Sequence, residues 1–123
     1  MQTKDFSGIR TNGPLPSPEE LQVPPDITDL WDDYTESTFS MLEELEKAAL
    51  AYEAGTDREV SASAVRRILH KIKGESGMVG IDDMSEFCHQ AEYAFEELDP
   101  EQRPDMLLKF KDWVCAAIQN IKG

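Results

Sequence analysis

The sequence lacks any long hydrophobic run. Its longest unbroken apolar stretch, residues 113–118, has six residues, whereas a membrane-spanning helix needs about 20. We therefore expect no helix of this chain to cross a bilayer. The first residues carry a single lysine with no apolar segment behind it, which is not the pattern of a secretory signal. A cytoplasmic location is our expectation.

Basic residues are also scarce. The chain has 12 Lys and Arg against 25 Asp and Glu, which gives a formal net charge of −13. A surface of that sign repels the phosphates of nucleic acids and of anionic lipid headgroups. We therefore predict that the partners of this protein include neither nucleic acid nor a membrane.

Cysteines and phosphate-binding loops are few or absent. Cys88 and Cys115 are the only cysteines, and both fall within apolar helical patterns, where a free thiol behaves as a small hydrophobe. No glycine-rich phosphate loop and no strand-helix nucleotide unit is present. The sequence therefore predicts no disulfide framework, no cofactor, and no ability to take a phosphoryl group from ATP unaided.

The chain length of 123 residues suits one domain with one core. Residues 1–25 hold five of the seven prolines together with Gly8 and Gly13. Such a composition buries too little apolar surface to offset the entropy of ordering it. We therefore predict a flexible proline-rich arm over residues 1–25, with at most one or two turns after Ser17, and a folded domain over residues 26–123.

Apolar residues recur every three or four positions in that domain, and no stretch shows sustained strand-like alternation. Gly55 and Gly80 are typical helix stops, and Asp82 or Asp83 is the expected cap of the third helix. Four amphipathic helices are predicted over about residues 27–54, 60–79, 82–98, and from either 99 or 104 to the end. Because short connections force neighbours to run in opposite directions, we predict an all-α, antiparallel four-helix bundle.

Positive charge is concentrated in one short segment. Residues 66–74 carry four bases and no acid, whereas residues 75–98 carry seven acids and no base. Most basic clusters of this size are solvated helix faces. This one, however, has a histidine, His70, at its centre, so its cations would surround an imidazole in an otherwise acidic protein.

A second face of the second predicted helix is polar. Arg66, His70, Lys73, Gly74 and Gly77 lie at positions i, i+4, i+7, i+8 and i+11, which places them on one side of the helix. Glycine inside a helix costs about 0.8 to 1.0 kcal/mol relative to alanine, so the two glycines need a reason. Either the helix packs closely against a neighbour there, or a bare strip lets another protein approach the imidazole.

The segment around His70 resembles a known family. Residues 69–80 read Leu-His-Lys-Ile-Lys-Gly-Glu-Ser-Gly-Met-Val-Gly, similar to the signature of the histidine-phosphotransfer (HPt) family: a histidine, a hydrophobic residue two positions later, Lys-Gly, a small residue, and a glycine ten past the histidine. Residues 87–92, Phe-Cys-His-Gln-Ala-Glu, and residues 41–55 resemble the amino-terminal phosphotransfer domain of chemotaxis histidine kinases. The resemblance covers about residues 29–98 and implies an HPt-like four-helix bundle.

The resemblance also implies roles for individual residues. The Nε2 atom of His70 would accept a phosphoryl group, and Glu92 and His89 would contact the other ring nitrogen and fix the tautomer. Lys73, one turn from His70, would counter the charge of the phosphoryl group. Each has a plainer interpretation: Glu92 as an exposed helix-face acid, His89 as a histidine at the edge of the core, and Lys73 as a solvated lysine.

The expected partners are a histidine kinase and the receiver domain of a response regulator, with any Mg²⁺ belonging to the partner's site. The active sites of receiver domains are clusters of carboxylates, so Arg66 and Arg67 would steer such a partner, and Gly74 and Gly77 would give it clearance. Lys71 and Glu75 depart from the family pattern, since the family has small or polar residues there, and they bear on partner identity. The resemblance therefore implies a stoichiometric phosphocarrier of a two-component phosphorelay and not an enzyme.

Three alternatives remain at this stage. The chain could be the phosphotransfer module of a larger chemotaxis-type histidine kinase. It could be a helical adaptor that binds a receiver without carrying phosphate. It could also be a metal-binding bundle, because Glu86, His89 and Glu92 give one Glu-x-x-His motif with a further acid; bundles of that kind need a second copy, and Arg67 stands where it would require an acid.

Overall fold

The computed structural model describes residues 4–24 and 27–122, so the predicted boundary between residues 25 and 26 lies outside the described part of the chain. Within these residues the secondary structure is helical, with no strand. The elements are α1 (Gly8–Thr11), the 3₁₀ turn η1 (Pro18–Glu20), α2 (Thr28–Ala54), α3 (Arg58–Met78), α4 (Asp82–Glu97), the 3₁₀ turn η2 (Pro100–Gln102) and α5 (Arg103–Lys122). No helix of the described part is long and apolar enough to span a membrane.

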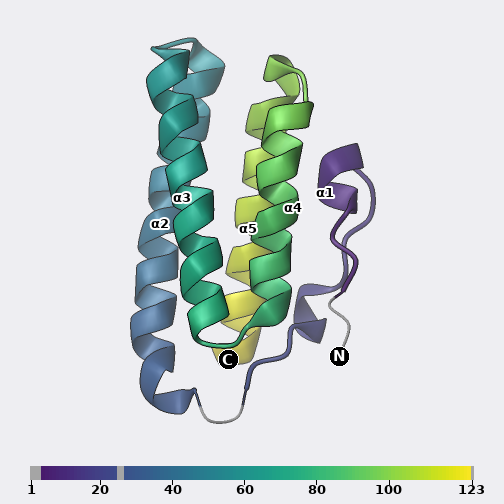
Figure 1. Cartoon of the computed structure of the whole chain (residues 1–123), viewed down its shortest axis with the longest axis vertical. Helices are drawn as coiled ribbons and strands as arrows, with labels where there is room; N and C mark the ends of the chain where they lie inside the picture. The colour runs from purple at the N-terminus through teal and green to yellow at the C-terminus, as the bar shows by residue number, and fades with distance from the viewer. Residues whose placement is uncertain (1–3, 25–26, 123) are drawn as a thin grey trace.

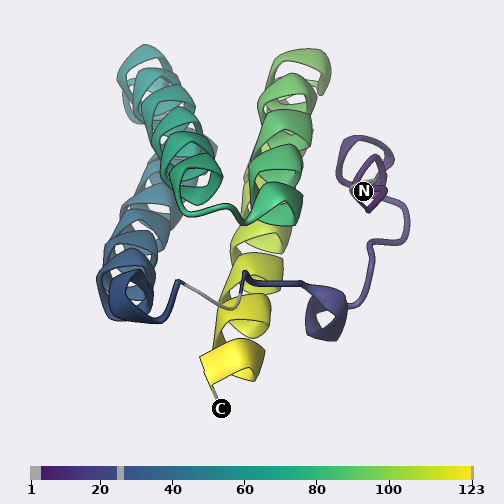
Figure 2. The same ribbon diagram turned by 60° about the horizontal axis from the view of Figure 1, so that its bottom comes forward.

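The four long helices form a ring in which each packs against two others. α2 contacts α3 and α5, and α4 likewise contacts α3 and α5. Figure 1 shows the helices side by side with their axes nearly aligned, and Figure 2 shows α3 and α4 converging towards the short loop that joins them. Chain neighbours run in opposite directions because their connections are short. The predicted antiparallel four-helix bundle is confirmed.

The helix ends follow local chemistry at two of the three connections. α2 stops at Gly55, whose φ of 79° is a left-handed conformation that glycine adopts without strain. α3 then begins after Asp57, whose side chain accepts a hydrogen bond from the backbone N–H of Val60. Gly80, with φ of 83°, turns the chain from α3 into α4. These residues set the lengths of α2 and α3 and therefore the level at which their side chains meet.

The prediction that Asp82 or Asp83 caps α4 is wrong. Ile81 occupies the cap position without a side-chain hydrogen bond, and the helix starts at Asp82. Asp83 accepts a hydrogen bond from the backbone N–H of Lys4 at 3.1 Å instead, and its carboxylate lies 3.5 Å from the Lys4 ammonium. The competing partner comes from far away in the sequence, which the local pattern could not reveal.

Helix α3 contributes aliphatic residues to the core, whereas α4 and α5 contribute several aromatic rings. On α3, Val65, Leu69 and Ile72 are completely buried. A buried polar contact joins the two helices α2 and α3: the hydroxyls of Tyr34 and Ser76 share a hydrogen bond of 2.7 Å, and burial raises the pKa of Tyr34 to about 12. The bond holds the C-terminal part of α3 against α2.

Residues 4–24, termed here the N-terminal segment, differ from the flexible arm that we expected. Phe6, Ile9 and Leu21 are buried in the same core as the bundle residues. The Phe6 ring stacks on Phe87 with a centroid distance of 4.7 Å and meets Trp113 edge-on at 5.1 Å. Figure 1 shows this segment on the side of α4 that is turned away from α3.

The prediction of flexibility from composition is wrong for this segment because composition averages over residues with different contacts. A few apolar side chains enter the α4 and α5 surface, while backbone contacts hold the rest. The indole N–H of Trp113 donates to the carbonyl of Pro16 at 2.7 Å, and the Lys109 ammonium donates to the carbonyl of Gly13 at 2.9 Å. Prolines also restrict the unfolded chain, so ordering the segment costs less entropy than its length suggests. The prediction of a short turn after Ser17 is confirmed by η1, which Ser17 caps.

Candidate functional site

His70 lies in the middle of α3 on the face turned towards α4. Its side chain is 76% exposed. The apolar stripe of α3 places Leu69 on the core side, so the next residue along the helix points out to solvent. The ring atom Nδ1 lies 3.8 Å from Oε2 of Glu92 on α4. This distance is longer than a hydrogen bond, but it places Nδ1 on the side of the carboxylate, and most of the ring is accessible to solvent.

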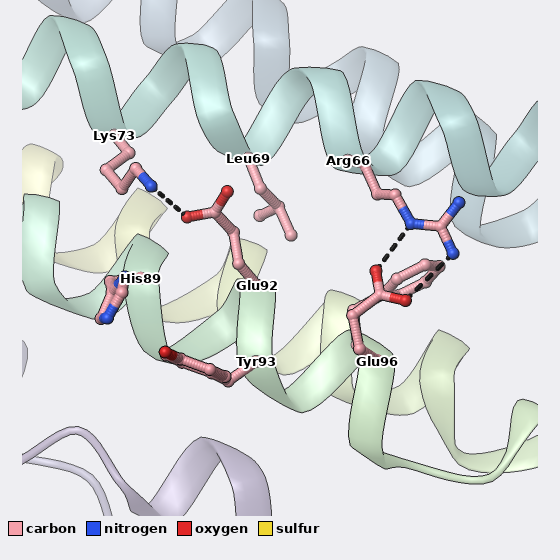
Figure 3. A pocket seen from close by; sticks show the side chains of 8 residues that line it. Arg66, Leu69, Lys73, His89, Glu92, Tyr93 and Glu96 are labelled. Atoms are coloured by element: carbon pink, nitrogen blue, oxygen red, sulfur yellow. Dashed lines mark hydrogen bonds and ion pairs between the residues drawn. The ribbon is translucent and has the colours of Figure 1, made fainter.

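Glu92 is shared between His70 and a lysine. The Lys73 ammonium lies 2.6 Å from Oε1 of Glu92, and both side chains are 28% exposed. Figure 3 shows this ion pair bridging α3 and α4. Because Lys73 stands one turn beyond His70 on the same helix face, its charge lies close to the imidazole. The structure thus brings His70, Lys73 and Glu92 together.

His89 has a different neighbour from the one we predicted. Its ring lies edge-on to Tyr93, with a centroid distance of 4.9 Å, and no contact with His70 is found in the described residues. His89 is exposed on α4 one turn before Glu92. A direct contact between His89 and the Nδ1 atom of His70 is therefore not part of this arrangement.

A groove of about 380 Å³ runs between α3 and α4 beside His70. Two ion pairs cross it: Lys73 with Glu92, and Arg66 with Glu96. The second is bidentate, with Arg66 donating to the two Glu96 oxygens at 2.6 and 3.1 Å. That contact lowers the pKa of the Glu96 carboxyl and raises the pKa of the Arg66 guanidinium. Arg66 is thereby held at the groove, and His89 and Tyr93 line its α4 side (Figure 3).

Arg67 and Glu75 contact α2 and do not line the groove, and Lys71 is exposed. Arg67 turns towards α2, where its guanidinium lies 3.9 Å from Glu44 and its side chain is 63% exposed. Glu75, which departs from the family pattern, accepts a hydrogen bond from the Ser37 hydroxyl of α2 at 2.9 Å. Glu75 therefore connects α3 to α2.

The two glycines of α3 face open space. A Cβ atom built on Gly74 would meet nothing within 4 Å, and one built on Gly77 would meet only Ser85 Oγ at 3.8 Å, an ordinary van der Waals distance. Close packing against a neighbouring helix therefore does not require a glycine at either position. The cost of two helical glycines is unexplained by contacts within the described part of the chain, which favours the interpretation that another molecule approaches this strip.

Sequence reasoning missed two groove residues on α4 and one residue outside the bundle. Tyr93 follows His89 by four positions and Glu96 follows Glu92 by four, so helical periodicity could have placed both on the predicted face. Arg10, whose guanidinium lies 5.5 Å from the centre of the Tyr93 ring, gives no such signal. Its position depends on how the N-terminal segment packs.

The acids of the alternative metal site are engaged by other side chains. Gln90 donates to Glu86 at 2.7 Å, and Lys73 pairs with Glu92. Within residues 4–24 and 27–122, no group of three or more His, Cys, Asp and Glu side chains is arranged to hold a metal ion. Glu86 thus bonds to a neighbour on its own helix, and Glu92 belongs to an ion pair of the groove.

The arrangement has the features that an imidazole needs in order to act as a nucleophile and accept a group from another molecule. The imidazole of His70 is largely exposed, a carboxylate lies near its Nδ1 atom, a lysine one turn away pairs with the same carboxylate, and the adjoining strip of helix is bare. A comparison with protein families finds that the family described as Hpt domain matches residues 29–121. Searches of curated proteins and of solved structures find no match.

Proposed function

The chain belongs to the Hpt domain family, and on that premise we propose that it accepts a phosphoryl group on His70 and passes it to a response-regulator receiver domain. Hpt domains are phosphocarrier modules of phosphorelays and are not enzymes in their own right. The proposal assigns the carrier role to one of the two histidines of the chain.

The observation that carries the proposal is the environment of the His70 ring. An imidazole must present one lone pair to react and hold its proton on the other nitrogen. With Glu92 Oε2 3.8 Å from Nδ1, the carboxylate favours the tautomer that is protonated at Nδ1. The remaining lone pair, on Nε2, then faces solvent, where a partner can reach it.

In the transfer step, the Nε2 lone pair attacks the phosphorus of an aspartyl phosphate or of the ATP γ-phosphate held by a kinase. The P–N bond forms as the P–O bond breaks, and the leaving oxygen takes the electron pair. The imidazole keeps its Nδ1 proton and becomes positively charged, and the Glu92 carboxylate stabilises that charge. In the forward transfer, a receiver carboxylate attacks the phosphorus, and the P–N electrons return to Nε2.

Lys73 stabilises the phosphoryl group during both steps. In the resting structure its ammonium is paired with Glu92 at 2.6 Å. A doubly charged phosphoryl group on Nε2 offers oxygens to the same ammonium from one helical turn away. Lys73 therefore holds charge at the reaction centre without being available to solvent anions in the resting state.

The partners approach over the bare strip of α3. Gly74 and Gly77 leave open space next to His70, and Arg67 and Lys71 add exposed positive charge to the same helix. A receiver's carboxylate-lined active site matches that charge, and so does the ATP-bearing site of a histidine kinase. The protein itself needs no cofactor in this scheme.

The proposal is tested by labelling with phosphoramidate, a small donor that phosphorylates histidine without a docking protein. The unmodified protein should gain a phosphoryl group that survives base and is lost in acid. His70→Gln should abolish that label, whereas His89→Gln should retain it. His89 is the matched control, because it is also exposed and lies one helix away.

The labelled protein is then mixed with purified receiver domains, and loss of its label to one of them completes the relay. Label that persists in His70→Gln would refute the assignment of the acceptor. Binding of His70→Gln to a receiver, combined with no label on the unmodified protein, would identify a helical adaptor in place of a carrier.

A further inference from the structure

The ionisable residues of helix α4 other than histidine, cysteine and tyrosine are all acidic, and cations of other elements pair with most of them. Its 16 residues include six acids and no lysine or arginine. Four of the six carboxylates pair with cations from other elements. The pairs are Lys73 with Glu92 and Arg66 with Glu96 from α3, and Lys4 with Asp83 and Arg10 with Glu97 from the N-terminal segment. Both edges of α4 are thus neutralised, one by α3 and the other by residues outside the bundle.

The outer edge is continuous with the groove beside His70. The Arg10 guanidinium lies 5.5 Å from the centre of the Tyr93 ring, and that ring meets His89 edge-on at 4.9 Å. Tyr93 and His89 line the groove that the Lys73–Glu92 pair crosses. Figure 3 shows both rings on α4, with α3 on one side of them and the N-terminal segment on the other. A partner lying over His70 and across α4 reaches Arg10 next.

Arg10 is held in place by its neighbours in the chain. Ile9 is buried and Phe6 stacks on Phe87 of α4, so the backbone on the N-terminal side of Arg10 is anchored. Gly8 allows a close approach that no other residue permits, because a Cβ there would lie 2.1 Å from the Pro14 carbonyl oxygen. The Arg10 charge therefore occupies a defined position and is not carried on a loose tail.

We propose that the N-terminal segment is a second part of the receiver-docking surface, with Arg10 as a specificity-determining residue. This inference rests on the proposed function. A receiver's active site is rimmed by carboxylates, and an unneutralised α4 would repel it. Lys4 and Arg10 remove that repulsion from the edge of α4 that α3 does not reach. The family match begins at residue 29, so this part of the surface lies outside the matched region. It can therefore differ from one family member to another and distinguish their partners.

The expected effect is on the rate of association. Charges at the rim of an interface change mainly the association rate and its dependence on salt. Arg10→Glu changes the charge by two units and places two acids opposite each other at Glu97. We expect transfer from the phosphorylated protein to its receiver to slow about tenfold at low ionic strength. The difference should shrink in 1 M salt, where charges are screened within about 3 Å.

The experiment separates docking from chemistry. The protein and its Arg10→Glu variant are phosphorylated with phosphoramidate, which needs no docking surface, and should label equally. Each is then mixed under rapid-quench conditions with the purified receiver domain that discharges the unmodified protein fastest in a panel. The measured quantity is the second-order rate constant of label loss, at low and at high salt.

Lys111→Glu is the matched control. Lys111 of α5 pairs with Glu46 of α2 at 2.6 Å, so the variant makes the same charge change and breaks a similar surface pair. Its rate constant should stay within about twofold of the unmodified protein. The double variant with Arg10→Glu and Glu97→Lys restores the pair and the summed charge, and should recover most of the rate even if the single variant loosens the segment.

Equal rate constants for Arg10→Glu and Lys111→Glu would overturn this inference while leaving the proposed function intact. Failure of phosphoramidate to label the unmodified protein would overturn the proposed function itself, and this inference with it. A slow double variant would show that the receiver does not sense the summed charge at this edge, which also contradicts the inference.

Discussion

The two faces of α3 differ in burial and in the contacts that their residues make. On the face towards α2 and the core, Leu69 and Ile72 are fully buried, and the Ser76 hydroxyl bonds to Tyr34. On the face towards solvent, His70 is largely exposed and Gly74 has open space where a side chain would stand. One helix thus carries buried residues that pack in the core and, on its other side, an exposed histidine and a glycine with open space around it.

The difference separates residues that stabilise the fold from residues that leave a surface open. A buried aliphatic residue stabilises the bundle by removing apolar surface from water. A glycine in an exposed helical position does the opposite, because alanine would stabilise the helix without any clash. The glycine strip next to an exposed imidazole therefore favours the interpretation that a second molecule approaches there.

The largest effect is expected from the core face. Ile72→Ala removes a completely buried side chain and should lower the free energy of unfolding by about 2 to 5 kcal/mol. Denaturant titration measures this loss. The folded fraction should still accept label from phosphoramidate, since the substitution leaves the His70 face intact. A loss below about 1 kcal/mol would contradict the close packing of this face.

A smaller loss is expected from the polar contact within the core. Tyr34→Phe leaves the buried Ser76 hydroxyl without its 2.7 Å partner and should cost about 1 to 3 kcal/mol of unfolding free energy. Ser76→Ala is the companion variant. The double variant should cost less than the sum of the two single variants, because both single changes remove the same bond. Additive losses would mean that the two hydroxyls do not interact.

The open face should respond with the opposite sign. Gly74→Ala should raise the unfolding free energy by up to about 1 kcal/mol, because alanine is the better helix former and the added Cβ meets nothing within 4 Å. Transfer to a receiver should nevertheless slow, since the methyl group obstructs the partner's approach. Labelling by phosphoramidate should stay unchanged.

Ser63→Ala is the control for that experiment, because Ser63 is also exposed on α3 but lies almost two turns before His70. It should leave transfer unaltered. A Gly74→Ala variant that is more stable and transfers at the normal rate would contradict the clearance interpretation.

The smallest effect on stability is expected at Arg67. Its pair with Glu44 is long, at 3.9 Å, and both side chains are more than half exposed. Arg67→Ala should therefore change the unfolding free energy by less than about 0.5 kcal/mol. The rate of transfer to a receiver should fall by about two- to threefold at low salt, as for a charge at the rim of an interface. A salt-independent rate would count against a steering role.

Much of the bundle could be predicted because its helices are amphipathic along their whole length. The spacing of residues such as Val65, Leu69 and Ile72 identifies the buried face of α3, and Gly55 and Gly80 mark where α2 and α3 end. The pairing of His70 with Glu92 across two helices came from the resemblance to a family. Periodicity gives the face of each helix but not the rotation of one helix against another.

The N-terminal segment could not be predicted in the same way. Its buried residues, Phe6, Ile9 and Leu21, follow no helical or strand period, and their partners lie far along the chain. The same limit applies to Asp83, which binds Lys4 instead of capping α4, and to Glu75, which binds Ser37. Each depends on a long-range contact for which the local sequence carries no signal.

The most direct test of the central claim is NMR spectroscopy of the phosphorylated protein with ¹⁵N-labelled histidine. The chemical shifts of the ring nitrogens identify which histidine, and which of its two nitrogens, carries the phosphoryl group. We predict phosphorylation at Nε2 of His70, with the proton retained on Nδ1 near Glu92. A phosphoryl group on Nδ1 of His70, or on His89, would contradict the account.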